Sequence, residues 1–152
     1  MKGFVEKYVP KVLKVKKTSC KELCKTSETA CVRNLCHLFD ALCSKLLDFK
    51  ATEDSNLVEQ FLFIEKWFVF CLIWSIGATV EETSRKDIDY VLRDIESMFP
   101  HSNTVFDHFI DPEKKDWAPW DQKLPPTFKP QSLEFNTINV PTVDTVRNRF
   151  IV

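Results

Sequence analysis

One apolar run constrains the fold of this chain more than any other feature: the 18 residues of Phe61–Ala78. Its uncharged part, Trp67–Ala78, has 12 residues, whereas a helix that spans a bilayer needs about 20. Glu65 and Lys66 interrupt the run upstream. We therefore interpret the run as a buried helix of a folded domain. Gly77 is its expected C-cap, because helices often end at a glycine in the left-handed conformation.

Apolar residues occupy nearly every face of this predicted helix, so it should have neighbours on several sides. One face carries Phe61, Ile64, Phe68, Leu72 and Ser75. We expect the structural core to be built around Trp67, Phe70, Leu72, Trp74 and Ile76, with Trp74 at the centre of the helical unit.

The composition supports a packed core and argues against several functions. Apolar residues make up 44% of the chain and aromatic residues 12%, which excludes general disorder. The net charge of −1 gives no reason to expect a nucleic acid or an anionic membrane as partner. Only two glycines are present, so these residues contain no glycine-rich phosphate loop.

The six cysteines favour free thiols over disulfides or a metal site. The chain starts with a charged amphipathic segment and not with the apolar stretch of a secretory signal, so we expect a reducing, cytosolic compartment. No two cysteines are spaced C-x2-C, and a zinc site is poorly supported. A thiol enzyme using Cys20 or Cys24 is also disfavoured, because helical spacing places no His or acidic partner beside either one.

Helical spacing covers most of the first 100 residues. Apolar positions recur over Phe4–Val15, where Pro10 should kink the helix or mark a nearby start. A second helix is predicted over about 28–48. Residues with helix-capping chemistry precede the predicted helices: Thr26, Ser27 and Glu28 before the second, Asn56 with Glu59 before the apolar one, and Ser84 before a further helix. The inner face of that last helix should carry Ile88, Val91, Leu92, Ile95 and Met98.

After Pro100 the pattern becomes extended. Thr104–Ile110 and Trp117–Trp120 are predicted as the two arms of a β-hairpin around a turn at Asp111. His101 and His108 are interpreted as surface or strand-face residues.

The prolines that follow exclude both a helix and a central strand. We therefore expect an extended connector there. A short strand over Phe135–Val140 follows, and Thr142 should cap a last helix.

The predicted fold class is therefore mainly α, with four parts. A helical bundle covers residues 1–100, a β-hairpin extension 101–121, a Pro-rich connector 122–134, and a strand with the start of a helix 135–152.

Three stretches together resemble the dynein heavy chain. They are Trp67–Thr79, then Thr104–Asp111 followed by Trp117–Trp120, and Val140–Arg147. Their order and spacing also agree with that family. The sequence Ile-Trp-Ser-Ile-Gly-Ala-Thr-Val-Glu-Glu is most similar to that of axonemal inner-arm heavy chains.

The resemblance implies a place in the motor ring. The chain would contain the helical lid of the second AAA+ module, the connector, and the first strand and helix of the third. The parent motor would bind ATP or ADP with magnesium, move along microtubules in the cytoplasm or a ciliary axoneme, and contact other dynein subunits. These residues contain no Walker or sensor motif, so the segment itself is expected to hold no cofactor and to be no enzyme.

Two functions follow as hypotheses. The first is a structural segment that transmits nucleotide-dependent movement between neighbouring AAA+ modules, with Asn139, Val140, Pro141 and Thr142 at the rim of a nucleotide pocket by resemblance. The alternative is a free-standing helical adaptor that binds protein partners through exposed aromatic residues, above all Trp117 and Trp120.

Overall fold

The computed structural model describes residues 2–47, 57–127 and 140–151. Its five α-helices within these residues are α1 (Lys2–Thr18), α2 (Glu28–Leu47), α3 (Leu57–Ser75), α4 (Arg85–Ile95) and α5 (Val143–Ile151). Its short 3₁₀ helices are η1 (Gly77–Thr79), η2 (Glu82–Ser84), η3 (Val105–Asp107) and η4 (Trp120–Lys123), and its strands are β1 (His108–Asp111) and β2 (Asp116–Pro119).

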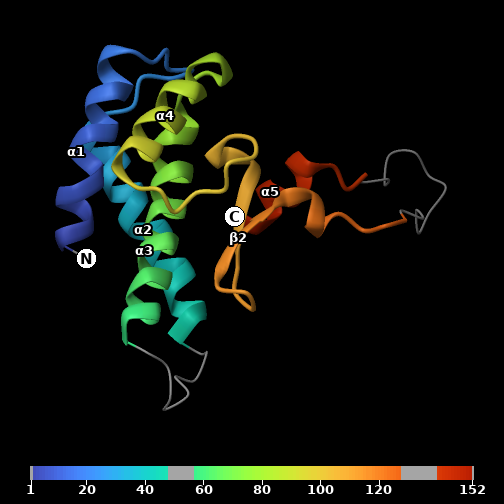
Figure 1. Ribbon diagram of the computed structural model, residues 1–152. Coiled ribbons are helices and arrows are strands. Elements are labelled where there is room, and N and C mark those ends of the chain that lie inside the picture. Colours follow the sequence, from blue (N-terminus) through green and yellow to red (C-terminus); the bar gives the residue numbers. More distant parts are fainter. Residues whose placement is uncertain (1, 48–56, 128–139, 152) are drawn as a thin grey trace.

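Helix α3 lies in the middle of the molecule. Helix α2 packs along it, α1 contacts both α3 and α4, and the hairpin strand β1 covers another side. Figure 1 shows these helices standing side by side, with the hairpin beside them and α5 on its far side. The predicted architecture, a mainly helical unit followed by a β-hairpin, is confirmed.

The second half of α3 forms the core, as its apolar pattern predicts. Every residue from Trp67 to Ile73 is buried, and Ile76 is completely inaccessible. The predicted core residues Trp67, Phe70, Leu72 and Ile76 are all buried, whereas Trp74 is only partly buried at the side that faces the hairpin. The helix therefore has neighbours on several sides.

The first half of α3 differs from the prediction. Phe61 is 56% exposed and Ile64 42% exposed, although both were expected on a buried face. The reason is that α1 covers this part of α3 only with Phe4, near its own start, whose ring lies 5.0 Å from that of Phe61. One turn earlier on α3, Leu57 is already 80% exposed. Apolar spacing indicates which face a neighbour can cover, but not how far that neighbour extends.

By length and composition alone, the segment Leu57–Thr79 could cross a membrane. This segment is longer than the 12-residue uncharged run on which the sequence argument was based. However, 61% of its most apolar part is buried inside the fold, and core helices pass the same test. The polar bonds that α1 makes to Glu65 in this helix also favour a core helix.

Gly77 is not the C-cap that we predicted. No glycine of the described residues has a positive φ angle, and the chain continues past α3 into η1. A Cβ atom on Gly77 would lie 3.1 Å from Cζ of Phe106 and 3.2 Å from Cγ2 of Ile88. The glycine is needed because two buried side chains approach the backbone there.

The capping predictions had mixed outcomes. Ser27 accepts a hydrogen bond from the Ala30 amide at 3.2 Å, and Thr142 accepts one from the Thr145 amide at 3.2 Å, so both cap their helices. Ser84 makes no capping bond to α4, because its Oγ accepts the Lys21 amide at 3.0 Å instead. The pair Asn56 and Glu59 lies partly outside the described residues. Helix α4 ends at Ile95, so the predicted inner-face residue Met98 lies beyond it.

The hairpin is antiparallel, with Phe109 opposite Ala118 and Ile110 opposite Trp117. Its first strand is shorter than predicted, because Thr104 and Asp107 form a capping box that folds Val105–Asp107 into η3.

The extended stretch after the hairpin also begins later than predicted. Helix η4 continues to Lys123, past the expected start of the connector at residue 122. The predicted strand over 135–140 lies outside the described residues except for Val140, which is not in a strand.

The chain between α1 and α2 is held by a buried lysine clasp. Lys16 is 3% exposed, and its ammonium group lies 3.0 Å from a carboxylate oxygen of Glu22. The same carboxylate oxygen accepts the Thr26 amide at 2.9 Å. This backbone hydrogen bond, and then the Lys16 ammonium, lower the pKa of the Glu22 carboxyl.

A valine at position 77 should destabilise the fold. Gly77→Val would insert a branched side chain against Phe106 and Ile88, and overpacking of this kind costs about 1–3 kcal/mol. Urea unfolding followed by circular dichroism measures the change. Gly3→Val is the matched control, because a Cβ atom there meets nothing within 4 Å. Equal stability of Gly77→Val and the parent chain would contradict the close approach.

The contribution of Glu22 should depend on pH. Its folded-state pKa is lowered, so its stabilisation is present above the unfolded value of about 4.3 and is lost as the pH falls through the folded value. We expect Glu22→Gln to lower the free energy of unfolding by about 1–2 kcal/mol at pH 7, and the difference to shrink as the pH falls through the folded-state pKa of Glu22. Thermal melts of both proteins between pH 3 and 7 measure this. A difference that persists unchanged at pH 3 would show that the carboxylate charge is not responsible.

Candidate functional site

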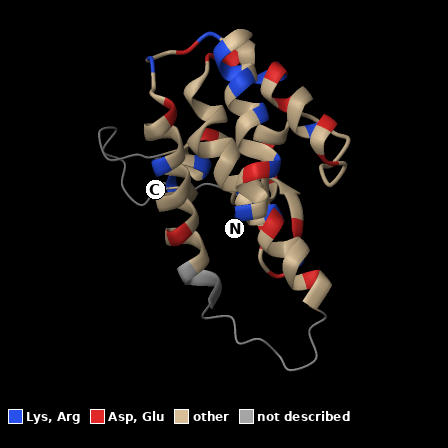
Figure 2. Cartoon of the chain, turned by 90° about the vertical axis from the view of Figure 1, so that its left-hand side faces the viewer, with Lys and Arg blue, Asp and Glu red and all other residues tan. Residues whose placement is uncertain are grey.

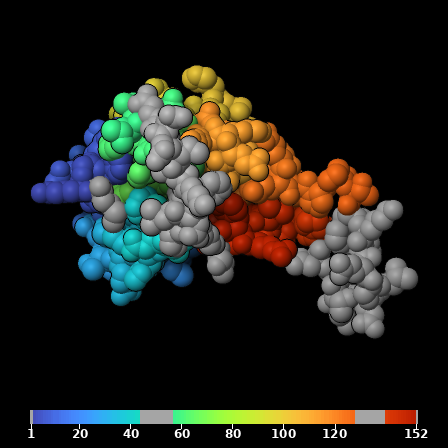
Figure 3. Space-filling model, turned by 90° about the horizontal axis from the view of Figure 1, so that it is seen from below, coloured from blue at the N-terminus to red at the C-terminus, as the bar shows by residue number. Residues whose placement is uncertain are grey.

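An aromatic cluster joins the helical unit to α5, and we call it the aromatic joint. Its rings come from four elements that are far apart in the sequence. They are Phe70 and Trp74 of α3, Phe109 of β1, Trp120 of η4 and Phe150 of α5. The contact of α5 with the rest of the molecule is visible from below in Figure 3, where the red helix lies against the orange hairpin.

Phe150 inserts among three rings of this joint. Its ring centroid lies 5.9 Å from that of Phe70, 6.0 Å from that of Phe109 and 5.5 Å from that of Trp120. All three pairs are edge-to-face, an arrangement that contributes about 0.5–1.5 kcal/mol per pair beyond the burial of apolar area. No residue of α5 is fully buried, and Phe150 is the one aromatic residue of this helix.

Two cations lie over the rings of the joint. The Lys123 ammonium group lies 4.4 Å from the centroid of Phe109 and 5.1 Å from that of Phe150, and so bridges the hairpin and α5. The Arg147 guanidinium group of α5 lies 5.1 Å from the Trp74 ring of α3, and it also forms an ion pair with Asp144. Cation–π contacts of this kind add about 0.5–2 kcal/mol each.

The hairpin side of the joint is held in place by hydrogen bonds to the backbone. The indole of Trp120 donates to the Phe106 carbonyl at 3.1 Å, and a ring nitrogen of the buried His108 lies 3.0 Å from the Thr104 carbonyl. His101 is exposed. The indole nitrogens of Trp74 and Trp117 have no partner. Trp120 therefore has the most defined orientation in the joint.

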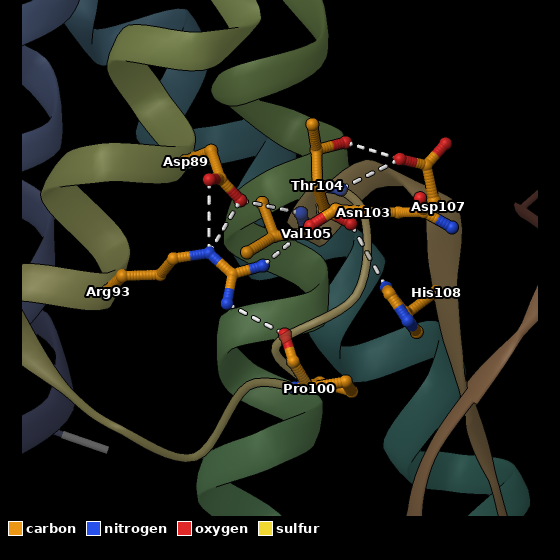
Figure 4. A network of polar contacts seen from close by, with 8 residues as sticks. All are labelled: Asp89, Arg93, Pro100, Asn103, Thr104, Val105, Asp107 and His108. Carbon is orange, nitrogen blue, oxygen red and sulfur yellow. Dashed lines mark hydrogen bonds and ion pairs between the residues drawn. The ribbon is translucent and has the colours of Figure 1, made fainter.

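A polar network ties the joint back to α4 (Figure 4). The Asp89 carboxylate accepts the Val105 amide at 2.7 Å and the Nε donor of Arg93 at 3.0 Å. Arg93 also donates to the carbonyl oxygens of Pro100 at 2.7 Å and Asn103 at 2.9 Å. One arginine thus holds two points, three residues apart, in the middle of the loop that leads from α4 to the hairpin, using the fork of donors that lysine lacks.

Of the predicted pocket rim, the structure describes three of four residues. Asn139 lies outside the described residues, Val140 is 52% exposed, Pro141 is half-buried, and Thr142 caps α5. These residues lie at the start of α5 and outside the aromatic joint. A contact with a nucleotide stays a prediction.

The adaptor hypothesis depended on exposed tryptophans, and that expectation is wrong. Trp117 is 8% exposed and Trp120 1% exposed. Trp117 stacks near Phe99, with centroids 5.4 Å apart, and Trp120 belongs to the joint. The two rings are covered in different ways: Trp117 of β2 packs against Phe99, whereas Trp120 lies in η4 against Phe109 and Phe150.

The described cysteines and acidic residues form no site of evident reactivity. All six cysteines are free, and no group of three metal-ligating side chains comes together within residues 2–47, 57–127 and 140–151. Burial raises the pKa values of the Cys20, Cys43 and Cys71 thiols, the opposite of what a nucleophilic thiolate requires.

Reasoning from the sequence did not find the joint itself. Phe150 was placed at helical spacing in the last helix, but the pattern does not say which rings it meets. One signal was present: Phe150 and Val146 are apolar positions four residues apart on a short helix, which needs a partner to be stable.

Comparison with known proteins agrees with this architecture. The dynein heavy chain AAA lid domain family matches residues 1–122. The chain is 40% identical over 148 residues to dynein axonemal heavy chain 2 of Homo sapiens, with 97% of this chain and 3% of the relative covered. It is 36% identical over 175 residues to the dynein-1-beta heavy chain of the flagellar inner arm I1 complex of Chlamydomonas reinhardtii, with 97% of this chain and 4% of the relative covered.

A ciliary dynein beta chain of Tripneustes gratilla is 28% identical over 153 residues, with 97% of this chain and 3% of the relative covered. The chain thus spans only a few per cent of the length of these relatives. The match is nonetheless continuous from the first helix to η4, the elements that build the helical unit and the hairpin. The chain therefore belongs to the dynein heavy chain AAA lid domain family.

Proposed function

We propose that this segment is a mechanical coupler of a dynein heavy chain that works in the ciliary or flagellar axoneme. It passes the movement of the helical lid to the module that begins with α5. The motor as a whole would use ATP or ADP with magnesium and contact microtubules and other dynein subunits. The segment itself would do no chemistry, because its sequence offers no phosphate loop.

The insertion of Phe150 into the aromatic joint carries this proposal. A rotation of the helical unit acts on Phe150 through Phe70 of the core helix and through Phe109 and Trp120 of the hairpin at once. Close-packed rings resist compression, so a displacement on one side is passed to the other. The connection is stiff where α5 meets the hairpin, as a coupler requires.

The Asp89 and Arg93 network supports the same function. The hairpin can transmit a rotation only if its own position on the helical unit is fixed. Arg93 holds Pro100 and Asn103, and Asp89 holds Val105, so the loop between α4 and the hairpin has little freedom to absorb movement.

The rim residues complete the proposal. By resemblance, Asn139, Val140, Pro141 and Thr142 would lie beside the adenine of a nucleotide bound by the following module. The exposed side chain of Val140 and the ring of Pro141 offer apolar surface to a purine, and Thr142 starts the helix that bears Phe150. Nucleotide binding and the joint would then share one short helix.

Removal of the Phe150 ring should uncouple the motor. In the complete heavy chain, we expect Phe150→Ala to weaken the docking of α5 by about 2 kcal/mol, since a half-buried phenylalanine loses less than the 3–5 kcal/mol typical of a core position. Microtubule gliding velocity should then fall by a larger factor than ATP turnover. Both rates are measured on the same preparation.

The matched control is Phe61→Ala, which removes the same ring from an exposed position outside the joint. It should leave gliding and ATP turnover coupled. Proportional losses of both rates in Phe150→Ala, or unchanged rates, would contradict the role of the joint as a coupler.

The rim is tested separately. Val140→Trp in the complete heavy chain should weaken ATP and ADP binding about tenfold if Val140 contacts the base, because a clash of this kind costs about 1–3 kcal/mol. Leu57→Trp, at a position that is 80% exposed, controls for the added ring. Calorimetric titration with both nucleotides measures the affinities, and equal affinities would remove Val140 from the pocket.

A further inference from the structure

The apolar contacts between α1 and α3, taken without those of α1 with α4, do not specify how far along α3 the first helix lies. The inner face of α1 carries Phe4, Tyr8 and Val12 at every fourth residue, all of them buried. They face a stripe of α3 in which Phe61 and Phe68 are the aromatic members. Because both stripes repeat about every helical turn, a shift by one turn, about 5.4 Å, exchanges one apolar pair for another.

The exposed start of α3 offers α1 an alternative position, one turn nearer to the start of α3. The two helices run in the same direction, since Phe4 meets Phe61 while Glu22, beyond the end of α1, pairs with Val80 beyond the end of α3. The stripe of α3 continues one turn further as Leu57, which is 80% exposed. If the last turn of α1 unwound by about three residues, the chain would gain about 5 Å, enough for this shift, but the buried bond between Lys16 and Glu22 would be released.

Within the stripe of α3, one buried carboxylate distinguishes the two positions. Glu65 lies in the middle of the α3 stripe and is 5% exposed. Its Oε1 accepts hydrogen bonds from the Lys7 ammonium group and the Tyr8 hydroxyl, each at 2.8 Å. The Lys7 ammonium group also lies 2.7 Å from Glu96, just after α4. The network of Lys7, Tyr8 and Glu65 thus joins α1 to α3, and its contact with Glu96 joins α1 to the end of α4.

The surroundings of these groups show how strongly they are coupled. Burial lowers the pKa of Lys7, but its bonds to Glu65 and Glu96 outweigh this effect and raise that pKa overall. Burial and the bond to Glu65 raise the pKa of the Tyr8 hydroxyl. Among the other titratable groups, only Glu96 contacts the network in the part of the chain that the structure describes. Figure 2, which faces this side of the molecule, shows acidic and basic residues interspersed over it.

A shift by one turn would leave Glu65 without its hydroxyl donor. Val12 would take the place of Tyr8, while Lys11 would take that of Lys7, so a cation remains but the tyrosine bond is lost. A buried carboxylate that loses a hydrogen bond is costly, because the surrounding apolar groups offer no replacement.

We propose that the hydrogen-bond network of Lys7, Tyr8 and Glu65 is the positioning device that selects one register of α1 on α3, while the apolar contacts supply the stability of this pair of helices. Buried polar groups are known to select a register in paired helices, often without adding stability. The network thereby sets how far along α3 helix α1 lies.

The proposal is tested by an apolar replacement of the whole network. In the variant Lys7→Met, Tyr8→Phe, Glu65→Met, we expect cooperative unfolding with a urea midpoint at or above that of the parent chain. Spin labels on unnatural amino acids at the exposed positions Lys14 and Glu59 report the register by pulsed electron paramagnetic resonance. The parent chain should give one distance, and the variant a second, shorter one that differs by up to about 5 Å.

The control is Val12→Ala, which removes an apolar contact and keeps the network. It should lower the urea midpoint and keep the single distance of the parent chain. A single, unchanged distance in the triple variant would overturn the proposal. Loss of cooperative unfolding in the triple variant would overturn it as well, because the network would then supply stability and not register. Glu65→Gln, which keeps both hydrogen-bond donors in reach of a side-chain oxygen, should retain the parent distance.

Discussion

The fold depends on the need to cover one helix on all sides. From Trp67 to Ile73 every side chain of α3 is apolar and buried, and helices α1 and α2 together cannot enclose it. The remaining side is closed by the hairpin and η4: Trp120 packs against Phe70, and Phe109 packs against Trp120. The burial of this one apolar surface is therefore what makes the hairpin part of the helical unit.

Closing that last side also creates the place where α5 attaches. Phe150 packs on the aromatic surface that α3, the hairpin and η4 form together, and the charged groups of Lys123 and Arg147 lie over its rings. The core of the lid and its contact with the following helix are thus one continuous aromatic cluster. For the coupling function that we propose, such continuity would allow a rotation to pass to the next unit without a flexible step.

The sequence predicted the elements well and their contacts less well. Helical spacing located α1, α2, α3 and α4, and the change to an extended pattern located the hairpin, because periodicity is a local property. Burial of Trp117 and Trp120 was missed, since an aromatic residue on a hairpin has the same pattern whether its face is covered or free. The same limit applies to Phe61, which has the apolar character of a core residue but lies beyond most of α1.

A residue type that is typical of helix ends can also serve another purpose in the structure. Ser84 has the composition of a helix cap, but its hydroxyl holds the chain after α1. Gly77 has the composition of a helix terminus, but it is required by the approach of Phe106 and Ile88. The joint could not be foreseen residue by residue, because its five rings come from segments that only the tertiary structure brings together. The rim residues were inferred by resemblance and not from their surroundings.

Pro10 in α1 has a consequence for the order of folding. A proline inside a helix removes one hydrogen bond, so α1 is a weak helix until it docks. Its docking partners are distant: Lys7 pairs with Glu65 at a separation of 58 residues and with Glu96 at 89 residues. At a synthesis rate of about 5–20 residues per second, Glu96 follows Lys7 from the ribosome by on the order of ten seconds. Helix α1 is made before α3 and α4, and it can be completed only after these two helices have formed the surface that receives it.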